Sequence, residues 1–378
     1  MQWATSCCSW QPGVCRSTCA SPTPYAARGG DEFVVLMAEV EAAHDAAQSA
    51  EKLVQVMAEP YLIGAHRLHV TASVGVSIYP DDGPAADAVL RNADTAMYHA
   101  KRSGRNNYQL FTGEMNLRAV ARQSVEVALR QALDQRQFVL HYQPKFNLQS
   151  GAITGAEALV RLQRSDRELV YPTEFVAIAE DCGLIAQIGH WVLFEACRQA
   201  AGWRQVGHAI GQIAVNVSAA EFHGKDFLPG VRAILGDTGL DPRHLEFELT
   251  ESGLMRDTHH TTDVLHALKD LGVQIAIDDF GTGYSSLSYL RRFPIDTLKI
   301  DQSFVQDIRH EAQEAILVGA IIAIGNSLKL QVVAEGIETR QQLAYLQSRH
   351  CSEGQGYYFG RPVEAAQFAA MMASSERH

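Results

Sequence analysis

The stretch AIDDFGTGYSSL occupies residues 276–287 and joins an apolar run to two adjacent carboxylates and a loop rich in glycine and hydroxyl side chains. The apolar run covers residues 273–277 and ends at Asp278 and Asp279. Functional residues of α/β proteins collect at the carboxyl ends of strands, so a buried strand that ends in two acids predicts a metal site. The same residues also fit a strand followed by an Asp-capped turn, because Asp, Gly and Ser are favoured at caps and turns. The rest of the chain has to distinguish these two interpretations.

From residue 137 onward, segments typical of strands alternate with segments typical of helices. Apolar or β-branched runs predict strands at residues 138–142, 153–162, 213–217, 245–249, 273–277, 297–300, 331–334 and 356–359. Helical periodicity predicts helices at residues 174–181, 184–203, 228–238, 261–271, 311–328 and 338–348. About eight strands that alternate with helices over roughly 240 residues are typical of a (β/α)8 barrel. The expected fold class is therefore α/β, with a TIM-like barrel as the main domain.

Nearly every predicted strand of this barrel ends at or beside an acid, an amide or a lysine. These residues are Glu157, Asn216, Glu246, Glu248, Glu251, Asp278, Asp279, Lys299, Asp301, Glu335 and Gln355. Any one of them alone could be a helix cap or a surface residue, but the carboxyl ends of barrel strands converge on one face. Carboxylate and amide oxygens without clustered Cys or His indicate Mg²⁺ or Mn²⁺ rather than zinc. Because the acids outnumber the ligands of one ion, we expect two ions, which suits an in-line phosphoryl displacement.

The same residues carry a resemblance to the EAL domain, the family of cyclic di-GMP phosphodiesterases, over about residues 122–370. The motifs occur in the family's order: YQP at 142–144, EALVR at 157–161, NVS at 216–218, ELTE at 248–251, DDFGTG at 278–283, KID at 299–301, AEGIE at 334–338 and GQGY at 354–357. The resemblance implies hydrolysis of cyclic di-GMP to linear pGpG in bacterial second-messenger signalling, and a homodimer formed through the EAL domain. Two alternatives stay open: a catalytically silent cyclic di-GMP receptor that signals through its dimer interface, and a phosphodiesterase of broader specificity.

The resemblance also implies which residues hold the two metal ions. The first ion would be bound by Glu157, Asn216, Glu248 and Asp278. The second site would be shaped by Asp278, Asp279 and Glu335. Both sets consist of the oxygen donors that Mg²⁺ and Mn²⁺ prefer.

The remaining motif residues are expected to act on water, substrate and loop. Lys299 would orient the attacking water, since a cation there favours hydroxide and offsets developing negative charge. The substrate would be contacted by Gln143, Arg161 and Gln355, with Arg161 as a phosphate donor. Glu251 would support the loop at residues 281–287, where the family couples dimer contact to activity. The residues expected to take part in catalysis are thus Lys299, Glu335 and Glu251.

One segment departs from the EAL pattern. After Arg161 the family usually continues with Trp and a His-Pro pair before a Gly turn, whereas this chain has LQRSDRE at residues 162–168. The departure alters the loop beside the expected substrate site and leaves the metal ligands unchanged. We therefore expect it to change the affinity for the substrate more than the catalytic reaction.

Upstream, the motif RGGDEF at residues 28–33 resembles the signature turn of the GGDEF domain of diguanylate cyclases. The strand-like residues 69–78, the segment ADTAMYHAK at 93–101 and the GRN at 104–106 extend the likeness. By analogy Glu32 would help bind metal, and Lys101 and Arg105 would approach the phosphates of the nucleotide. Only the later part of such a domain is expected, because the first strand with its metal-binding Asp and the inhibitory Arg-x-x-Asp are absent ahead of the turn. We therefore predict a truncated, degenerate GGDEF domain without cyclase activity.

The chain is expected to divide into four segments. They are an irregular or disordered segment at 1–27, a partial GGDEF domain at 28–112, a helical connector at 113–136 and the EAL barrel at 137–372. The net charge of −11 argues against binding to duplex nucleic acid, which requires a basic face. No apolar run reaches the roughly 18–20 residues of a membrane helix, and the N-terminus does not resemble a signal peptide. A cytoplasmic protein is expected.

Overall fold

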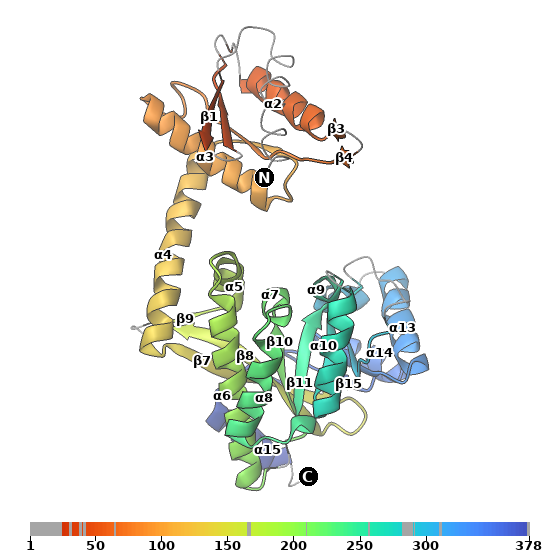
Figure 1. The fold of residues 1–378 in the computed structure, drawn as a ribbon. Coiled ribbons are helices and arrows are strands. Elements are labelled where there is room, and N and C mark those ends of the chain that lie inside the picture. Colours follow the sequence, from red (N-terminus) through yellow and green to blue (C-terminus); the bar gives the residue numbers. More distant parts are fainter. Residues whose placement is uncertain are drawn as a thin grey trace. The chain divides into compact units, whose positions relative to one another are not determined.

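The computed structural model describes residues 25–29, 32–37, 40, 43–63, 66–164, 168–208, 210–255, 258–281, 290, 292–309 and 312–375. The chain separates into two compact units, residues 1–124 and 125–378 (Figure 1). Among the helices of these described residues, none has the length and apolar character needed to cross a membrane.

In its described residues, the first unit contains short paired strands and the helices α2 and α3. Its elements are β1 (Tyr25–Gly29), β2 (Glu32–Val35), α2 (Ala43–Met57), β3 (Tyr61–Ile63), β4 (His66–Leu68), β5 (Val74–Val76), α3 (Ala86–Arg102) and β6 (Tyr108–Leu110). β1 and β2 are antiparallel neighbours within and beside the RGGDEF motif, with Gly29 opposite Glu32. The predicted strand at residues 69–78 is shorter in the structure, where only β5 is a strand.

Gly75 on β5 shows how closely this unit is packed. A Cβ at Gly75 would lie 2.0 Å from the backbone oxygen of Ala93 on α3. Any side chain at this position would therefore push the helix away from the strand, which explains a glycine inside a β-branched run. β5 also pairs in parallel with β6, so α3 lies against a small parallel sheet.

The helix α4 (Gly113–Gln135) follows β6 and runs without interruption for 23 residues. It corresponds closely to the helical connector expected at residues 113–136. Its last turns belong to the second unit, where Leu129 and Ala132 are fully buried.

The second unit is a closed barrel of eight strands. They are β7 (Phe138–Asn147), β8 (Ile153–Gln163), β10 (Gln212–Val217), β11 (Leu245–Thr250), β12 (Gln274–Phe280), β13 (Thr297–Ile300), β14 (Gln331–Ala334) and β15 (Glu353–Gly354). Neighbouring strands pair in this order, and the barrel closes because β8 also pairs with β10. The short strand β9 (Leu169–Val170) adds to the edge of β8. The expected TIM-like barrel is thus confirmed.

The first barrel strand differs from the simple alternation of strands and helices. β7 is antiparallel to both of its neighbours, β8 and β15, whereas the other neighbouring pairs in the closed barrel are parallel. Only residues 148–152 connect β7 to β8, and a link of that length cannot make the crossover that parallel strands require. The last strand also differs from the expectation, because it lies at Glu353–Gly354 and residues 356–359 form a turn after it.

Helices cover the outside of the barrel strands (Figure 1). They are α5 (Pro172–Asp181), α6 (Ile185–Gln205), α7 (Ala219–Phe222), α8 (Phe227–Thr238), η1 (Pro242–His244), α9 (Glu251–Leu254), α10 (Thr258–Leu271), α12 (Gln302–Gln306), η2 (Asp307–Arg309), α13 (Ala312–Ser327), α14 (Arg340–Ser348) and α15 (Ala365–Ser375). β11 illustrates the resulting layers. Its alternate residues Leu245 and Phe247 belong to the apolar core under the helices, and the residues that follow each of them, Glu246 and Glu248, are buried charges of the interior.

Candidate functional site

The ammonium group of Lys299 on β13 lies among four carboxylates. Its Nζ is 2.6 Å from Glu248 Oε2, 2.6 Å from Glu335 Oε1, 3.1 Å from Asp278 Oδ1 and 3.9 Å from Glu157 Oε2. Lys299 is 1% exposed. These five residues come from β8, β11, β12, β13 and the residue directly after β14, so the structure brings together side chains from five strands of the barrel.

Strand register explains why these side chains meet. Asn216 on β10 is directly opposite Glu248 on β11, and Thr250 is opposite Asp278 on β12. Glu157 lies in the middle of β8 rather than at its end, but it pairs with Ala214, two residues before Asn216. Because side chains alternate along each strand, residues of one parity all point into the barrel.

Two amides complete the arrangement around Glu157. Asn216 Nδ2 donates to Glu157 Oε1 at 2.6 Å, and Gln355 Nε2 donates to Glu157 Oε2 at 2.6 Å. Gln355 Nε2 also donates to Glu335 Oε1 at 3.0 Å. The amide oxygen of Gln355 is buried and has no hydrogen-bond partner among the described residues, so it is an acceptor still able to take a donor or a cation.

Burial and the closeness of several carboxylates shift the pKa values of the residues in this group. Burial, reinforced by Asp278 and other neighbouring acids and only partly offset by Lys299, raises the pKa of Glu335 to about 8. Burial and then Glu248 raise the pKa of Glu157. Burial alone would raise the pKa of Glu248 as well, but two lysine contacts lower it to about 2. Burial would lower the pKa of Lys299, yet the four carboxylates hold it well above its ordinary value.

A second buried layer lies directly behind these acids, and of its residues only Glu246 was among the candidates that the sequence offered. Lys145 Nζ donates to Glu246 Oε1 at 2.7 Å and to Glu248 Oε1 at 2.8 Å. Thr297 Oγ1 donates to Glu246 Oε2 at 2.7 Å. The sequence does indicate that Lys145 points into the barrel. Lys145 follows Gln143 by two residues, so both side chains lie on the same face of the strand.

Asp279 takes a different position from Asp278. Its backbone has φ of 54°, in the left-handed region, and its amide donates to Asp278 Oδ1 at 3.0 Å. Burial, Asp278 and Asp301 raise the pKa of the Asp279 carboxyl to about 6. The structure thus places Asp279 beside Asp278 and Asp301, at the rim of the group around Lys299.

Glu251 is buried at the first residue of α9, directly after β11. It belongs to the same strand end as Glu248. Of the loop at 281–287 that Glu251 was expected to support, residues 282–287 lie outside the described residues. The supporting role of Glu251 stays a prediction.

The residues expected to contact substrate lie on β7, on β8 and directly after β15. Gln143 on β7 is directly opposite Glu157 on β8, and Gln355 bonds to Glu157 as described above. Arg161 lies four residues further along β8, and its guanidinium stacks 5.1 Å from the ring centroid of Tyr171. Arg161 Nη1 also donates to the backbone oxygen of Val160 at 2.8 Å. Tyr171 was not anticipated from the sequence.

The donors suit a hard divalent cation in their chemistry, because they are carboxylate and amide oxygens. Within the described residues, however, no three His, Cys, Asp or Glu side chains are arranged to hold a metal ion as they stand. The Lys299 ammonium instead lies among the acids, as the distances above show. Counting Glu246, five carboxylates lie around the two lysines Lys145 and Lys299. This excess of acids and the unused oxygen of Gln355 still fit the binding of additional positive charge.

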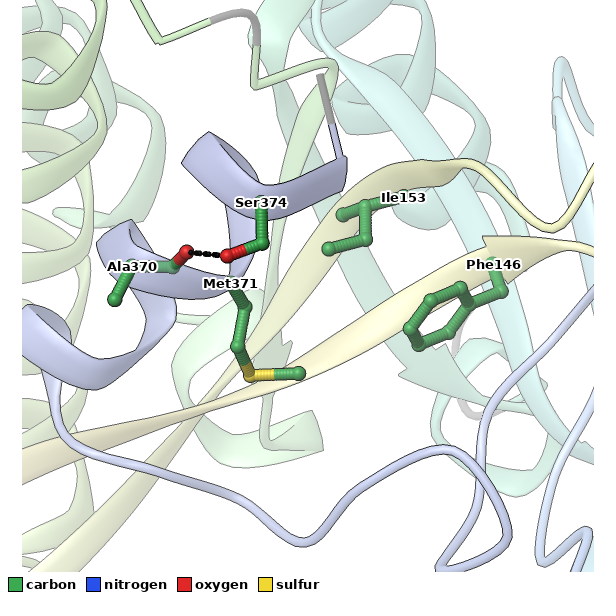
Figure 2. A pocket seen from close by; sticks show the side chains of 5 residues that line it. All are labelled: Phe146, Ile153, Ala370, Met371 and Ser374. Atoms are coloured by element: carbon green, nitrogen blue, oxygen red, sulfur yellow. Dashed lines mark hydrogen bonds between the residues drawn. The ribbon is translucent and has the colours of Figure 1, made fainter. Parts of the chain in front are cut away.

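Two other features of the chain lie outside this group of acids. An open apolar hollow lies between α15 and the β7–β8 hairpin, and Figure 2 shows its lining residues, Phe146, Ile153, Ala370, Met371 and Ser374. None of these side chains is acidic or basic, so the hollow lacks the groups for acid–base or phosphate chemistry. In the first unit, Lys101 Nζ lies 4.0 Å from Glu32 Oε1, so two residues of the GGDEF resemblance are near each other.

The fold and the site together define a class of protein: an α/β barrel with an acidic, lysine-centred site at the carboxyl ends of its strands. Comparison with known families is specific. The EAL domain family model matches residues 126–362, and the model of the diguanylate cyclase GGDEF domain matches residues 16–107. The chain therefore belongs to the EAL domain family, and it carries a GGDEF match ahead of the barrel, as the sequence resemblance predicted.

Individual relatives agree with this assignment. The chain is 47% identical over 345 residues to the bifunctional diguanylate cyclase/cyclic di-GMP phosphodiesterase MucR of Pseudomonas aeruginosa, covering 91% of this chain and 50% of MucR. It is 44% identical over 337 residues to the cyclic di-GMP phosphodiesterase NbdA of the same organism, covering 89% of this chain and 43% of NbdA. The chain thus spans about half the length or less of these curated relatives.

Among solved structures, the PaMucR phosphodiesterase in complex with c-di-GMP is similar to this chain. The TM-score is 0.63 at 46% sequence identity, and the match covers 65% of this chain and 99% of that chain. The likeness therefore extends over essentially the whole of that phosphodiesterase structure.

Proposed function

We propose that the chain hydrolyses cyclic di-GMP to linear pGpG in bacterial second-messenger signalling, with Mg²⁺ or Mn²⁺ as cofactor and two ions in the site. The observation that carries the proposal is the convergence of Glu157, Glu248, Asp278 and Glu335 on the buried Lys299. The likeness to a phosphodiesterase structure that contains c-di-GMP supports the choice of substrate.

The proposal assigns the ions to the oxygen donors. Glu157, Asn216, Glu248 and Asp278 would hold the first ion, and Asp278, Asp279 and Glu335 would shape the second site. Bound ions would stabilise charge on the phosphate oxygens and lower the pKa of water. The excess of buried carboxylates over lysine charge supports this assignment, because buried charge requires a counter-charge.

The remaining roles belong to side chains of the chain itself. Lys299 would orient the attacking water, and its ammonium already stands within 3.1 Å of three carboxylate oxygens that could position that water with it. Arg161 would donate hydrogen bonds to a phosphate, and Gln143 and Gln355 would contact the substrate beside Glu157. Burial of these groups strengthens each electrostatic contact relative to water.

The proposal is tested by incubating the protein with cyclic di-GMP and Mn²⁺ and following pGpG by chromatography. We expect pGpG from the natural chain and none from Glu157→Ala, because Glu157 bonds to both amides of the site. Bound but unchanged cyclic di-GMP would favour the receptor alternative over the enzyme.

We further propose that the first unit does not make cyclic di-GMP and that it has a regulatory role at most. Residues 1–27, directly ahead of the RGGDEF motif, carry no strand or helix pattern that matches the earlier part of a GGDEF domain, which supports this. Incubation of the chain with GTP and Mg²⁺ should yield no cyclic di-GMP, whereas product formation would contradict the proposal. Phosphodiesterase activity measured with and without GTP then reports whether this unit regulates the barrel.

We also propose that the chain is cytoplasmic and forms a homodimer through the barrel. The proposed domain bounds are 28–112 for the GGDEF unit and 137–372 for the barrel. Exposed apolar side chains on α13, namely Ile316 at 65% and Leu317 at 42%, support an interface on the barrel. Light scattering after size-exclusion chromatography tests the dimer, and a monomeric mass at working concentration would contradict it.

A further inference from the structure

Behind the acids around Lys299, the barrel holds a second buried ion pair, Lys145 and Glu246, to which the proposed chemistry gives no role. Lys145 on β7 contacts Glu246 Oε1 at 2.7 Å and Glu248 Oε1 at 2.8 Å. Lys145 is 2% exposed, and both glutamates are 1% exposed. The interior of such a barrel is usually filled by branched apolar side chains. Buried charges at this depth are costly unless they are fully paired, so their presence calls for a reason.

The pair forms its own layer of the interior. Glu246 precedes Glu248 by two residues on β11, and Thr297 precedes Lys299 by two residues on β13, so both lie one layer deeper than the candidate site. Thr297 Oγ1 donates to Glu246 Oε2 at 2.7 Å. Both oxygens of Glu246 therefore accept a hydrogen bond, which holds Glu246 in place as the anchor for Lys145.

Glu248 is the residue at which the two layers meet. Its Oε1 accepts from Lys145 at 2.8 Å, and its Oε2 accepts from Lys299 at 2.6 Å. A carboxylate that is held through one oxygen cannot rotate freely, so its other oxygen keeps a fixed direction toward the site. Partners that hold metal ligands in this way usually alter metal affinity by about 10–100-fold when they are removed.

We propose that Lys145 is a positioning residue for the divalent-ion site, acting by holding Glu248 through Oε1 while Glu246 and Thr297 hold Lys145. This inference rests on the proposed function, because it concerns the same site. It goes beyond that function in giving a role to residues that contact neither substrate nor reacting atoms.

Two simpler explanations predict different results. If the pair contributed only charge, removing Lys145 alone would strengthen cation binding, and removing Lys145 with Glu246 would leave it unchanged. If the pair only filled space, apolar side chains of similar size would preserve binding and could even raise stability. A positioning role instead predicts weaker ion binding when both charges are replaced together.

The test is a Mn²⁺ titration of the full chain, with free Mn²⁺ measured by electron paramagnetic resonance. The part of the binding that Asp278→Asn removes is assigned to the barrel site. In the double variant Lys145→Met/Glu246→Met, we expect the Kd of this site for Mn²⁺ to rise about tenfold or more, since Glu248 Oε1 loses its donor. The melting temperature of the same variant, measured without metal, shows that the barrel is folded. If that variant does not fold, Lys145→Gln/Glu246→Gln is used instead. The glutamine side chain at position 145 is one bond shorter than lysine, so its amide cannot reproduce the lysine contact with Glu248.

A matched control is available at the other end of the barrel. Lys269 on α10 pairs with Asp296 at 2.6 Å, just before β13 begins, and Lys269→Met should leave the Kd for Mn²⁺ unchanged. An unchanged or lower Kd in the double variant would overturn the positioning role and leave the proposed function intact. A natural chain that binds no Mn²⁺ in the barrel would overturn both, so the two failures can be told apart.

Discussion

Replacement of Lys299 by Met should destabilise the barrel when divalent ions are absent. Met is similar in length and carries no charge, so the packing is largely kept while three buried carboxylates and the partly buried Glu335 lose their shared ammonium. Removing one partner of a buried ion pair usually costs about 3–5 kcal/mol. For a domain of this size about 2–4 °C of melting temperature corresponds to 1 kcal/mol. We therefore expect the transition of the barrel to fall by about 6–20 °C, with turnover lost.

Mn²⁺ should restore part of this stability. Without the ammonium, the carboxylates around position 299 present a stronger negative field, which favours a bound cation. A ligand that binds only the folded state adds about 2.7 kcal/mol at a hundredfold excess over its Kd. The assay is differential scanning calorimetry of the natural chain and Lys299→Met, each in EDTA and in Mn²⁺. The chain has two units, so the barrel transition is identified as the one that responds to Mn²⁺.

The control for this experiment is Lys269→Met. Lys269 and Asp296 have side chains that are 25% and 30% exposed, so the loss should stay below about 1 kcal/mol with no dependence on Mn²⁺. Equal melting temperatures of the natural chain and Lys299→Met in EDTA would refute the view that Lys299 is the required counter-charge. A smaller Mn²⁺ response in Lys299→Met than in the natural chain would refute the link to cation binding.

Three further variants test other parts of the site. Glu251→Ala should lower the turnover of cyclic di-GMP about 10–100-fold while Mn²⁺ binding is kept, and unchanged turnover would show that its supporting role is wrong. Tyr171→Ala should raise the KM for cyclic di-GMP about 2–5-fold at constant kcat, because it removes the stacking on Arg161. Tyr171→Phe keeps the ring and should leave the KM unchanged. Equal KM values for the two variants would contradict this role of the ring. Gly281→Ala should lower the free energy of unfolding in urea by about 1–3 kcal/mol, because φ at Gly281 is +100° and a Cβ would lie 3.0 Å from Phe304 Cε2. An unchanged urea midpoint would disprove this strain.

Much of the fold is predictable from the sequence, since strands and helices differ in the period of their apolar residues. The antiparallel direction of β7 could also have been inferred, because the link at residues 148–152 is too short for a crossover. The closing strand was misplaced by a few residues. Glu353–Gly354 contains only two residues and includes a buried acid, so it has no apolar run by which a strand could be recognised.

The sequence points to the residues of the candidate site, but it does not show which of them are in contact. The acids and amides that follow the strands are visible in the sequence, and the structure brings Glu157, Glu248, Asp278 and Glu335 to Lys299. Tyr171 could not be found in this way, because it lies outside the motifs and reaches Arg161 only through the fold.

The sequence by itself determined which side chains point into the barrel, because neighbouring residues of a strand face opposite sides and the order of residues is local information. Only the tertiary structure decided which of them touch. Gln355 bonds to Glu157 across 198 positions of the chain, and Lys145 reaches Glu248 across 103. Such contacts depend on the register between strands and on the closure of the sheet, and burial then forces each charge to find a partner.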